Sequence, residues 1–255
     1  MEKYESYDLT EEQWKRIQPL LPPENRWKKG QPRKDDRMML NDMLWMNHSG
    51  VQWRQLPVRY GPWQSVYARF AKWRDEGIWE NIFSELCEDA DTGNLSIDST
   101  CVKVHESSNG GGKTGSKAVG RTKGGLNMKL HAIVDGLGNP VAFLLSPGND
   151  NDSTHVIELM SMTDLTGSNL LGDKVYGAKD ILAYIREHGA VVVIPPKSNT
   201  KEPWPVDYCL YKERHLVECF FQKIKWFRRV STRFDKLDKS FLAFVYLAAI
   251  LIWLL

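Results

Sequence analysis

The stretch LSIDSTCVKV, residues 95–104, decides the fold of this 255-residue chain. Its apolar and polar residues alternate, and several of them are β-branched, which is typical of a half-buried strand. The residues before it have helical periodicity and are rich in Trp. The change near residue 94 therefore predicts an all-helical region at 1–92 followed by an α/β domain at 93–255.

Downstream of this strand, the pattern predicts an alternation of short strands and helices. The turn DGLGN at 135–139 joins two apolar runs as a hairpin. The resulting order, β-β-β-α-β-α-β-α, is that of a mixed sheet with helices packed on it. The expected strands are 129–134, 140–145, 170–171 and 190–194, and the expected helices are 154–161, 178–188, 212–227 and 239–254.

The N-terminal region is expected to contain four short helices separated by tight turns and basic loops. They begin near Thr10, Asp35, Pro62 and Trp79. Such a region is compatible with a helix-turn-helix unit that reads DNA. A helical cap on the main domain fits the pattern equally well.

The helix expected at 212–227, extended by one residue to include Tyr211, carries four polar residues on one face. At about 100° per residue they fall within a stripe roughly 60° wide, while the apolar residues of the segment lie on another face. A carboxylate flanked by cations favours a metal ion together with a phosphate. The four residues are Tyr211, Arg214, Glu218 and Lys225.

Two further acids, Asp98 and Asp173, belong to segments that read as strands. Strands disfavour Asp, and an acid at the carboxyl end of a strand in an open sheet is where sites tend to form. The alternatives are a solvent-facing residue for Asp98 and a cap or turn residue for Asp173. Asp98, Asp173 and Glu218 together would suit two hard divalent ions and phosphodiester chemistry, with Arg214 and Lys225 binding phosphate.

The net charge is only +2, but the basic residues are clustered. Residues 26–37 contain six Lys or Arg against two Asp, and residues 212–239 contain nine against four acids. Such clusters predict phosphate contacts that weaken with salt, although solvated faces are an equally ordinary explanation. The candidate DNA-binding residues are Arg33, Lys34, Arg37, Arg54, Lys113, Lys117, Arg121, Lys123, Lys129, Lys174, Arg228, Arg229 and Arg233.

Other features narrow the class of protein. The four cysteines have no C-x-x-C spacing, so neither a zinc site nor a disulfide framework is expected. The N-terminus has no apolar signal region, and a cytoplasmic location is expected. The apolar run at 241–255 has fifteen residues, short of the ~20 that span a membrane, so we expect a core or interface helix.

These segments resemble the DDE transposases of bacterial insertion sequences, the family numbered five. Tyr211-x2-Arg214-x3-Glu218-x6-Lys225 is similar to its Tyr-Arg-Glu-Lys signature. IDSTCVKVH and LLGDKVYGAKDI are similar to the segments that carry its first and second Asp. GRTKGGLNMKLHAIVDGLGNP resembles its basic hairpin, FRRVSTRFDK its tail, and LTEEQWKRIQPLLP its N-terminal region.

The resemblance covers nearly the whole chain and implies both a fold and an activity. It implies a ribonuclease-H-like catalytic fold behind a helical DNA-binding region, with two Mg²⁺ ions that Mn²⁺ can replace. It implies cleavage and joining of the element's own ends. The implied partners are double-stranded DNA, as terminal inverted repeats and target, and a second copy in a dimer or larger assembly at the bacterial nucleoid.

Two positions depart from the family pattern. Val175 stands where the family more often has Gly, and a positive φ there would strain the turn beside Asp173. Cys219 stands where the family usually has Arg or Asn, so a polar contact beside Glu218 would be lost. An alternative reading is therefore a weakened or inactive transposase-derived protein that still binds DNA.

Overall fold

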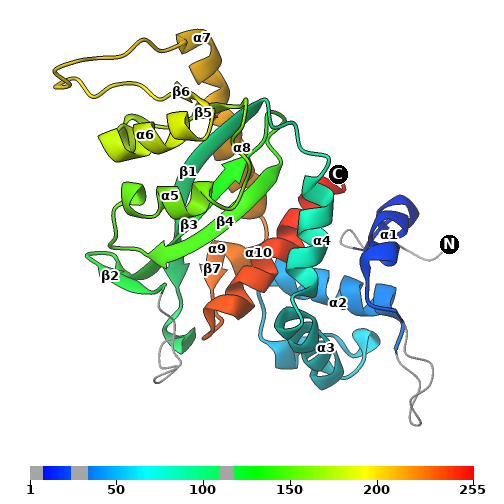
Figure 1. Ribbon diagram of the computed structural model, residues 1–255. Coiled ribbons are helices and arrows are strands. Elements are labelled where there is room, and N and C mark those ends of the chain that lie inside the picture. Colours follow the sequence, from blue (N-terminus) through cyan, green and yellow to red (C-terminus); the bar gives the residue numbers. More distant parts are fainter. Residues whose placement is uncertain (1–7, 24–33, 109–117) are drawn as a thin grey trace.

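The computed structural model describes residues 8–23, 34–108 and 118–255. A mixed sheet lies at its centre, with the strands in the order β4-β3-β1-β5-β6 (Figure 1). The first three strands are antiparallel, and β5 and β6 continue parallel to β1. The main strands are β1 (Asn94–Val104), β3 (Gly125–Val134), β4 (Pro140–Pro147), β5 (Asn169–Leu171) and β6 (Val191–Val193). The mixed α/β sheet expected from the sequence is confirmed.

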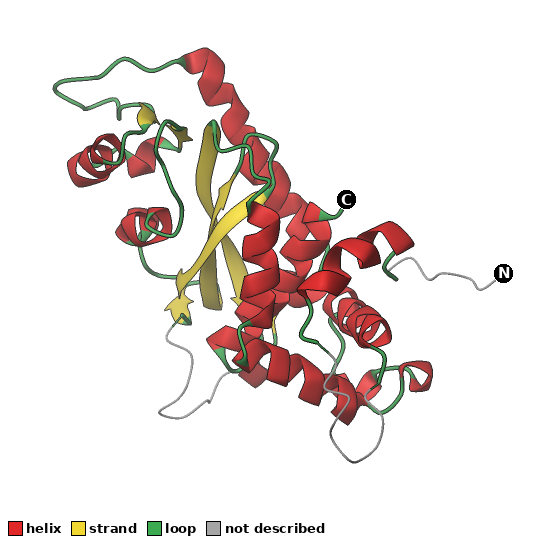
Figure 2. Ribbon diagram, turned by 45° about the vertical axis from the view of Figure 1, so that its right-hand side comes forward, coloured by secondary structure: helices red, strands yellow, loops and turns green. Residues whose placement is uncertain are grey.

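Helices cover both faces of this sheet, as Figure 2 shows. On one side, α5 (Val156–Met160) and α6 (Lys179–Glu187) form a core with Leu95 and Ile97 of β1. On the other side, α8 (His215–Ile224) forms a core with Val102 and Val104. Because side chains alternate along a strand, even-numbered residues of β1 face α8 and odd-numbered residues face α5.

The N-terminal helices pack against the α8 side of the sheet. They are α1 (Glu11–Ile17), α2 (Asp36–Ser49), α3 (Trp63–Asp75) and α4 (Ile78–Cys87). Thr10 begins α1 with a capping box, and the Asp35 carboxylate caps α2, as their residue types favour. These helices share one hydrophobic core with the sheet, so a domain boundary at residues 92 and 93 stays a prediction.

The apolar C-terminal run forms α10 (Asp238–Trp253), which is a core helix. Eleven of its sixteen residues are buried, and Phe244 stacks on Phe70 of α3 with ring centroids 4.4 Å apart. Its own chain covers most of it, so the expectation of a core helix is confirmed, and a role at an interface stays a prediction. No helix in the described part of the chain is long and apolar enough to cross a membrane.

Several local details differ from the expected elements. The helix expected at 212–227 begins earlier, as α7 (Tyr208–Tyr211), and passes through a 3₁₀ turn at Lys212–Arg214 into α8. Two very short strands were not expected, β2 (Gly120–Thr122) and β7 (Thr232–Arg233). Pieces of two or three residues carry too little alternation to be recognised from sequence. A four-residue helix, α9 (Arg228–Ser231), precedes β7.

Candidate active site

Asp98 of β1 and Glu218 of α8 are joined by one guanidinium. Nη1 of Arg214 lies 3.2 Å from Oδ2 of Asp98, and Nη2 lies 2.5 Å from Oε1 of Glu218. Arg214 presents its donors in a planar fork, which suits two carboxylates at once. Two acids that are distant in sequence therefore meet at one point between the sheet and α8.

The other members of the polar stripe lie along the same face. The guanidinium of Arg214 is 6.0 Å from the ring centroid of Tyr211, within the range of a cation–π contact. Lys225 donates from Nζ to Oγ1 of Thr100 at 2.5 Å. Since Asp98 and Thr100 are on the same face of β1, Arg214 and Lys225 both reach this face of the strand.

Asp173 follows β5, the strand that pairs with β1 in parallel. The parallel register pairs Ser96 with Leu171, and Asp98 and Asp173 each stand two residues beyond that pair. Asp173 therefore lies just beyond the carboxyl end of β5, at the position that matches Asp98 in the middle of β1. Asp173 also accepts from the Lys174 amide at 2.6 Å and caps the 3₁₀ turn Lys174–Tyr176, so the cap reading is correct as well.

The acids affect one another electrostatically. Partial burial raises the pKa of Asp98 above its ordinary value, and the nearby carboxylates of Glu218 and Asp152 raise it further. The Ser99 amide and Arg214 act in the opposite direction but do not cancel the shift. The site thus concentrates negative charge in a half-buried position, which a cation would offset.

Oxygen donors of this kind suit Mg²⁺, so the donor set fits such an ion. The side chains are not gathered into a finished cluster, however. Within residues 8–23, 34–108 and 118–255, no group of three or more His, Cys, Asp or Glu is close enough to hold a metal ion. Glu218 is directed at Arg214, and the assignment of the three acids to one metal site stays a prediction.

Four residues beside Asp98 were not singled out from the sequence. Ser99 donates to Asp152 at 2.5 Å, Thr100 accepts from Lys225, and the hydroxyl of buried Tyr176 also contacts Ser99. Burial raises the pKa of Tyr176, and Asp98 and Asp152 add to the shift. The only signal for Asp152 was its place in the polar segment GNDND, which follows a strand.

The expected strain at Val175 is absent. No described residue other than glycine has a positive φ, and Val175 lies in the 3₁₀ turn after Asp173 with its side chain 39% exposed. The turn accepts a β-branched residue because it does not use the left-handed region. Val175 therefore gives no structural reason to expect a weakened site.

The candidate DNA-binding residues separate by exposure. Several are at the surface and remain candidates: Lys34 is partly exposed, and Arg54, Arg121, Lys123, Lys174 and Arg228 are exposed. Arg37 is paired with Glu11 near the start of α2. Arg33, Lys113 and Lys117 lie outside the described residues.

Three of the candidates do not fit a phosphate contact. Arg233 is fully buried and pairs with Asp238 at 2.6 Å, and Arg229 is 4% exposed and lies 3.4 Å from Asp235. Lys129 is mostly buried and pairs with Asp152 at 2.8 Å. Assigning these three to DNA was wrong, because each side chain is largely buried and paired with an acid of its own chain.

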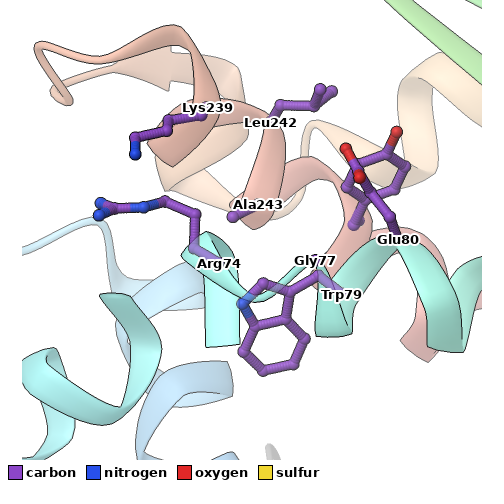
Figure 3. Close-up of a pocket in the computed structure, with 8 residues that line it drawn as sticks. Arg74, Gly77, Trp79, Glu80, Lys239, Leu242 and Ala243 are labelled. Atoms are coloured by element: carbon purple, nitrogen blue, oxygen red, sulfur yellow. The ribbon is translucent and has the colours of Figure 1, made fainter. Parts of the chain in front are cut away.

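A small cavity lies away from these acids, between the junction of α3 with α4 and helix α10 (Figure 3). Its volume is about 50 Å³, and Arg74, Trp79 and Lys239 are among the residues that line it. That volume accommodates a few water molecules and no larger ligand. It is therefore not a candidate site for the chemistry.

A mixed sheet with acids placed in this way is compatible with the class of metal-dependent nucleases and DNA transferases. Comparison with known proteins narrows the class. Residues 9–83 match a family model described as "Putative transposase of IS4/5 family", and residues 90–203 match one described as "Transposase DDE domain". The chain belongs to the DDE transposases of insertion sequences.

Individual relatives are consistent with this membership. The chain is 35% identical to a "Putative transposase for insertion sequence element IS6501" of Brucella ovis over 133 residues, 51% of this chain and 99% of that protein. It is 38% identical over 98 residues to an uncharacterized protein, y4sN, of Sinorhizobium fredii, covering 38% of this chain and 78% of the relative.

Two solved structures are more distantly similar. The piggyBac transposase synaptic complex with hairpin DNA has a TM-score of 0.41 at 12% identity, over 75% of this chain and 48% of that one. The Mos1 transposase paired-end complex has a TM-score of 0.29 at 13% identity, over 82% of this chain and 80% of that one. We draw no conclusion about this chain from likeness at that level.

Proposed function

We propose that this chain is an active transposase that cuts DNA at the ends of its element and joins them to target DNA. The observation that carries the proposal is the meeting of Asp98 and Glu218 on Arg214, with Asp173 at the matching position of the neighbouring strand. Asp98, Asp173 and Glu218 are the residues that would hold divalent metal. We expect two Mg²⁺ ions, which Mn²⁺ can replace.

Bound Mg²⁺ would activate a water or a 3′-hydroxyl and stabilise the leaving oxygen. The protein's own contribution is positioning and charge. Arg214 holds the Asp98 and Glu218 carboxylates in one orientation, and its guanidinium is available to a phosphate when Glu218 turns away. Lys225 donates to Thr100, two residues after Asp98, and so places a second positive charge near the acids. No side chain is required as a general base.

The DNA partner is inferred from exposed basic residues. Arg121 lines a surface groove of about 560 Å³ together with Lys103 near the far end of β1. Lys174 is exposed next to Asp173, and Arg228 follows α8. These side chains would contact the phosphates of terminal repeats and target DNA, with two copies pairing two ends at the bacterial nucleoid.

The test is cleavage of duplex DNA that carries the element's ends, in Mg²⁺, by wild type and Asp98→Asn. We expect the variant to bind this DNA as wild type does and to cut it at least a thousandfold more slowly. Cleavage by Asp98→Asn at the wild-type rate would contradict the proposed function.

A DNA-binding protein without catalysis was the alternative. This alternative was based on two residues, Val175 and Cys219. The backbone at Val175 is unstrained. Cys219 is partly exposed and lies next to Glu218, whose carboxylate is held by Arg214. The contacts around Glu218 therefore support the active enzyme.

A further inference from the structure

A second polar network lies on the face of β1 opposite to α8. It is centred on Ser99, the residue next to Asp98. Ser99 donates from Oγ to Oδ1 of Asp152 at 2.5 Å. Nζ of Lys129 lies 2.8 Å from the same Asp152 oxygen and donates to the carbonyl of Asp150 at 2.6 Å. Ser99 and Lys129 come from neighbouring strands, while the two acids belong to the segment after β4.

This network meets β1 where the strand is least supported. The pairing of β1 with β5 ends at Ser96, and its pairing with β7 begins at Lys103. Between those points, no described strand pairs with that edge of β1, and β3 alone holds the backbone. Local backbone stability depends on such bonds, so the segment that carries Asp98 needs other attachments.

Side chains supply these attachments at three successive residues. Asp98 is held by Arg214 and Thr100 by Lys225, both from the α8 side. Ser99 is held by Asp152 from the other side, and the Ser99 amide in turn donates to Oδ1 of Asp98 at 2.8 Å. A single chain of contacts therefore runs from Asp152 through Ser99 to the Asp98 carboxylate.

The surroundings of Asp152 match this role. Burial would raise the pKa of Asp152, but hydrogen bonds from Lys129 and Ser99, together with the charges of Lys129 and His131, leave it below its ordinary value. The carboxylate thus stays ionised and keeps accepting from both partners. Lys129 has a side chain only 13% exposed, which suits a structural counter-ion.

We propose that Asp152 is a positioning residue for the catalytic centre, acting through Ser99 to fix the direction of the Asp98 carboxylate. It does so without touching DNA or the ion. The proposal rests on the proposed function, since it assumes that Asp98 is a metal ligand. Outer partners of this kind typically change metal affinity or activity 10–100-fold when they are removed.

The test uses Asp152→Asn and Ser99→Ala, with Ser99→Thr as the variant that retains a hydroxyl. Asp150→Asn is the matched control, because it removes the same charge two residues away and leaves the bond to Ser99 in place. Three readouts are used: the Kd for Mn²⁺ of the DNA-free protein by calorimetry, amide hydrogen exchange at 97–101 without metal, and the Mg²⁺ concentration for half-maximal cleavage.

We expect Asp152→Asn and Ser99→Ala to raise the Kd for Mn²⁺ about tenfold or more and to speed exchange at 97–101. Ser99→Thr and Asp150→Asn should remain within about twofold of wild type. Unchanged Mn²⁺ affinity in a folded Ser99→Ala protein, or equal losses in Asp150→Asn, would overturn the inference. If Asp98→Asn still cuts DNA, the proposed function fails instead, so the two failures are distinguishable.

Discussion

Arg214 donates to Asp98 across 3.2 Å while its other nitrogen holds Glu218, so one guanidinium sets the position of two of the three acids. Arg214 also lowers the pKa of Asp98, against the effect of burial. We predict that Arg214→Ala raises this pKa further and moves the acid limb of the cleavage rate to higher pH. The rate above that limb should fall about a hundredfold, as for loss of one charge-stabilising donor.

The pH profile of single-turnover cleavage checks this prediction. Arg214→Lys is the control, because it keeps the charge but loses the planar fork. Its acid limb should lie close to that of wild type while its rate stays low. An unchanged profile in Arg214→Ala would contradict the assigned role.

Lys225 and Thr100 form a pair that a double-mutant cycle can measure. We predict that Lys225→Met and Thr100→Val are coupled by about 1 kcal/mol in stability, because each removes the same 2.5 Å hydrogen bond. Only Lys225→Met should also slow cleavage, since it alone removes a charge beside the acids. Additive effects in denaturant unfolding would show that the bond does not contribute.

Arg228 and Arg229 are adjacent in sequence and opposite in environment. Arg228 is exposed, whereas Arg229 is buried, donates to the carbonyl of Val51 and lies over the ring of Phe244. We predict that Arg228→Ala weakens DNA binding and lowers its salt slope by about 1, without changing the melting temperature. Fluorescence anisotropy over a range of salt concentrations measures this slope.

Arg229→Met should give the reverse result. Removing one partner of a buried ion pair costs about 3 kcal/mol, which lowers the Tm of a chain this long by roughly 6–12 °C. The salt slope of the folded protein should not change. If Arg229→Met altered DNA binding and spared the Tm, Arg229 would belong to the DNA surface after all.

Asp42 of α2 predicts an unusual pH dependence. It is fully buried, neither of its oxygens has a hydrogen-bond partner among the described residues, and burial raises its pKa to about 7. Because the folded state binds this proton more tightly than the unfolded state, stability should fall as pH rises from about 4 to 7. The full effect is on the order of 4 kcal/mol.

The measurement is unfolding by denaturant at pH 5 and at pH 8 in wild type and Asp42→Asn. Wild type should be less stable at pH 8, and the variant should lose most of that difference whatever its absolute stability. An equal pH dependence in the two proteins would mean that Asp42 ionises freely in the folded state.

The sequence predicted the parts of the site that follow a regular period. Alternation along 95–104 placed Asp98 on one face of the strand, and helical spacing placed Arg214 and Glu218 on one face of the helix. These two faces meet because α8 packs on β1. Asp152 escaped notice because its contact with Ser99 joins an irregular segment to a strand, and no local period predicts such a contact.

The prediction of phosphate contacts along FRRVSTRFDK, residues 227–236, failed for a different reason. The run has the composition of a basic surface, but Arg229 and Arg233 turn inward and pair with Asp235 and Asp238 a few residues later. The acids that neutralise them were visible in the sequence. Their direction was not, because it depends on the short α9 and β7, where the chain turns back against α10.

The central claim is that Asp98, Asp173 and Glu218 share divalent metal. Anomalous scattering from crystals grown with Mn²⁺ and DNA carrying the element's ends tests it most directly. We expect peaks about 2.0–2.3 Å from oxygens of these three side chains, with Glu218 released from Arg214. Manganese bound elsewhere in crystals of a protein that cuts the same DNA would contradict the account.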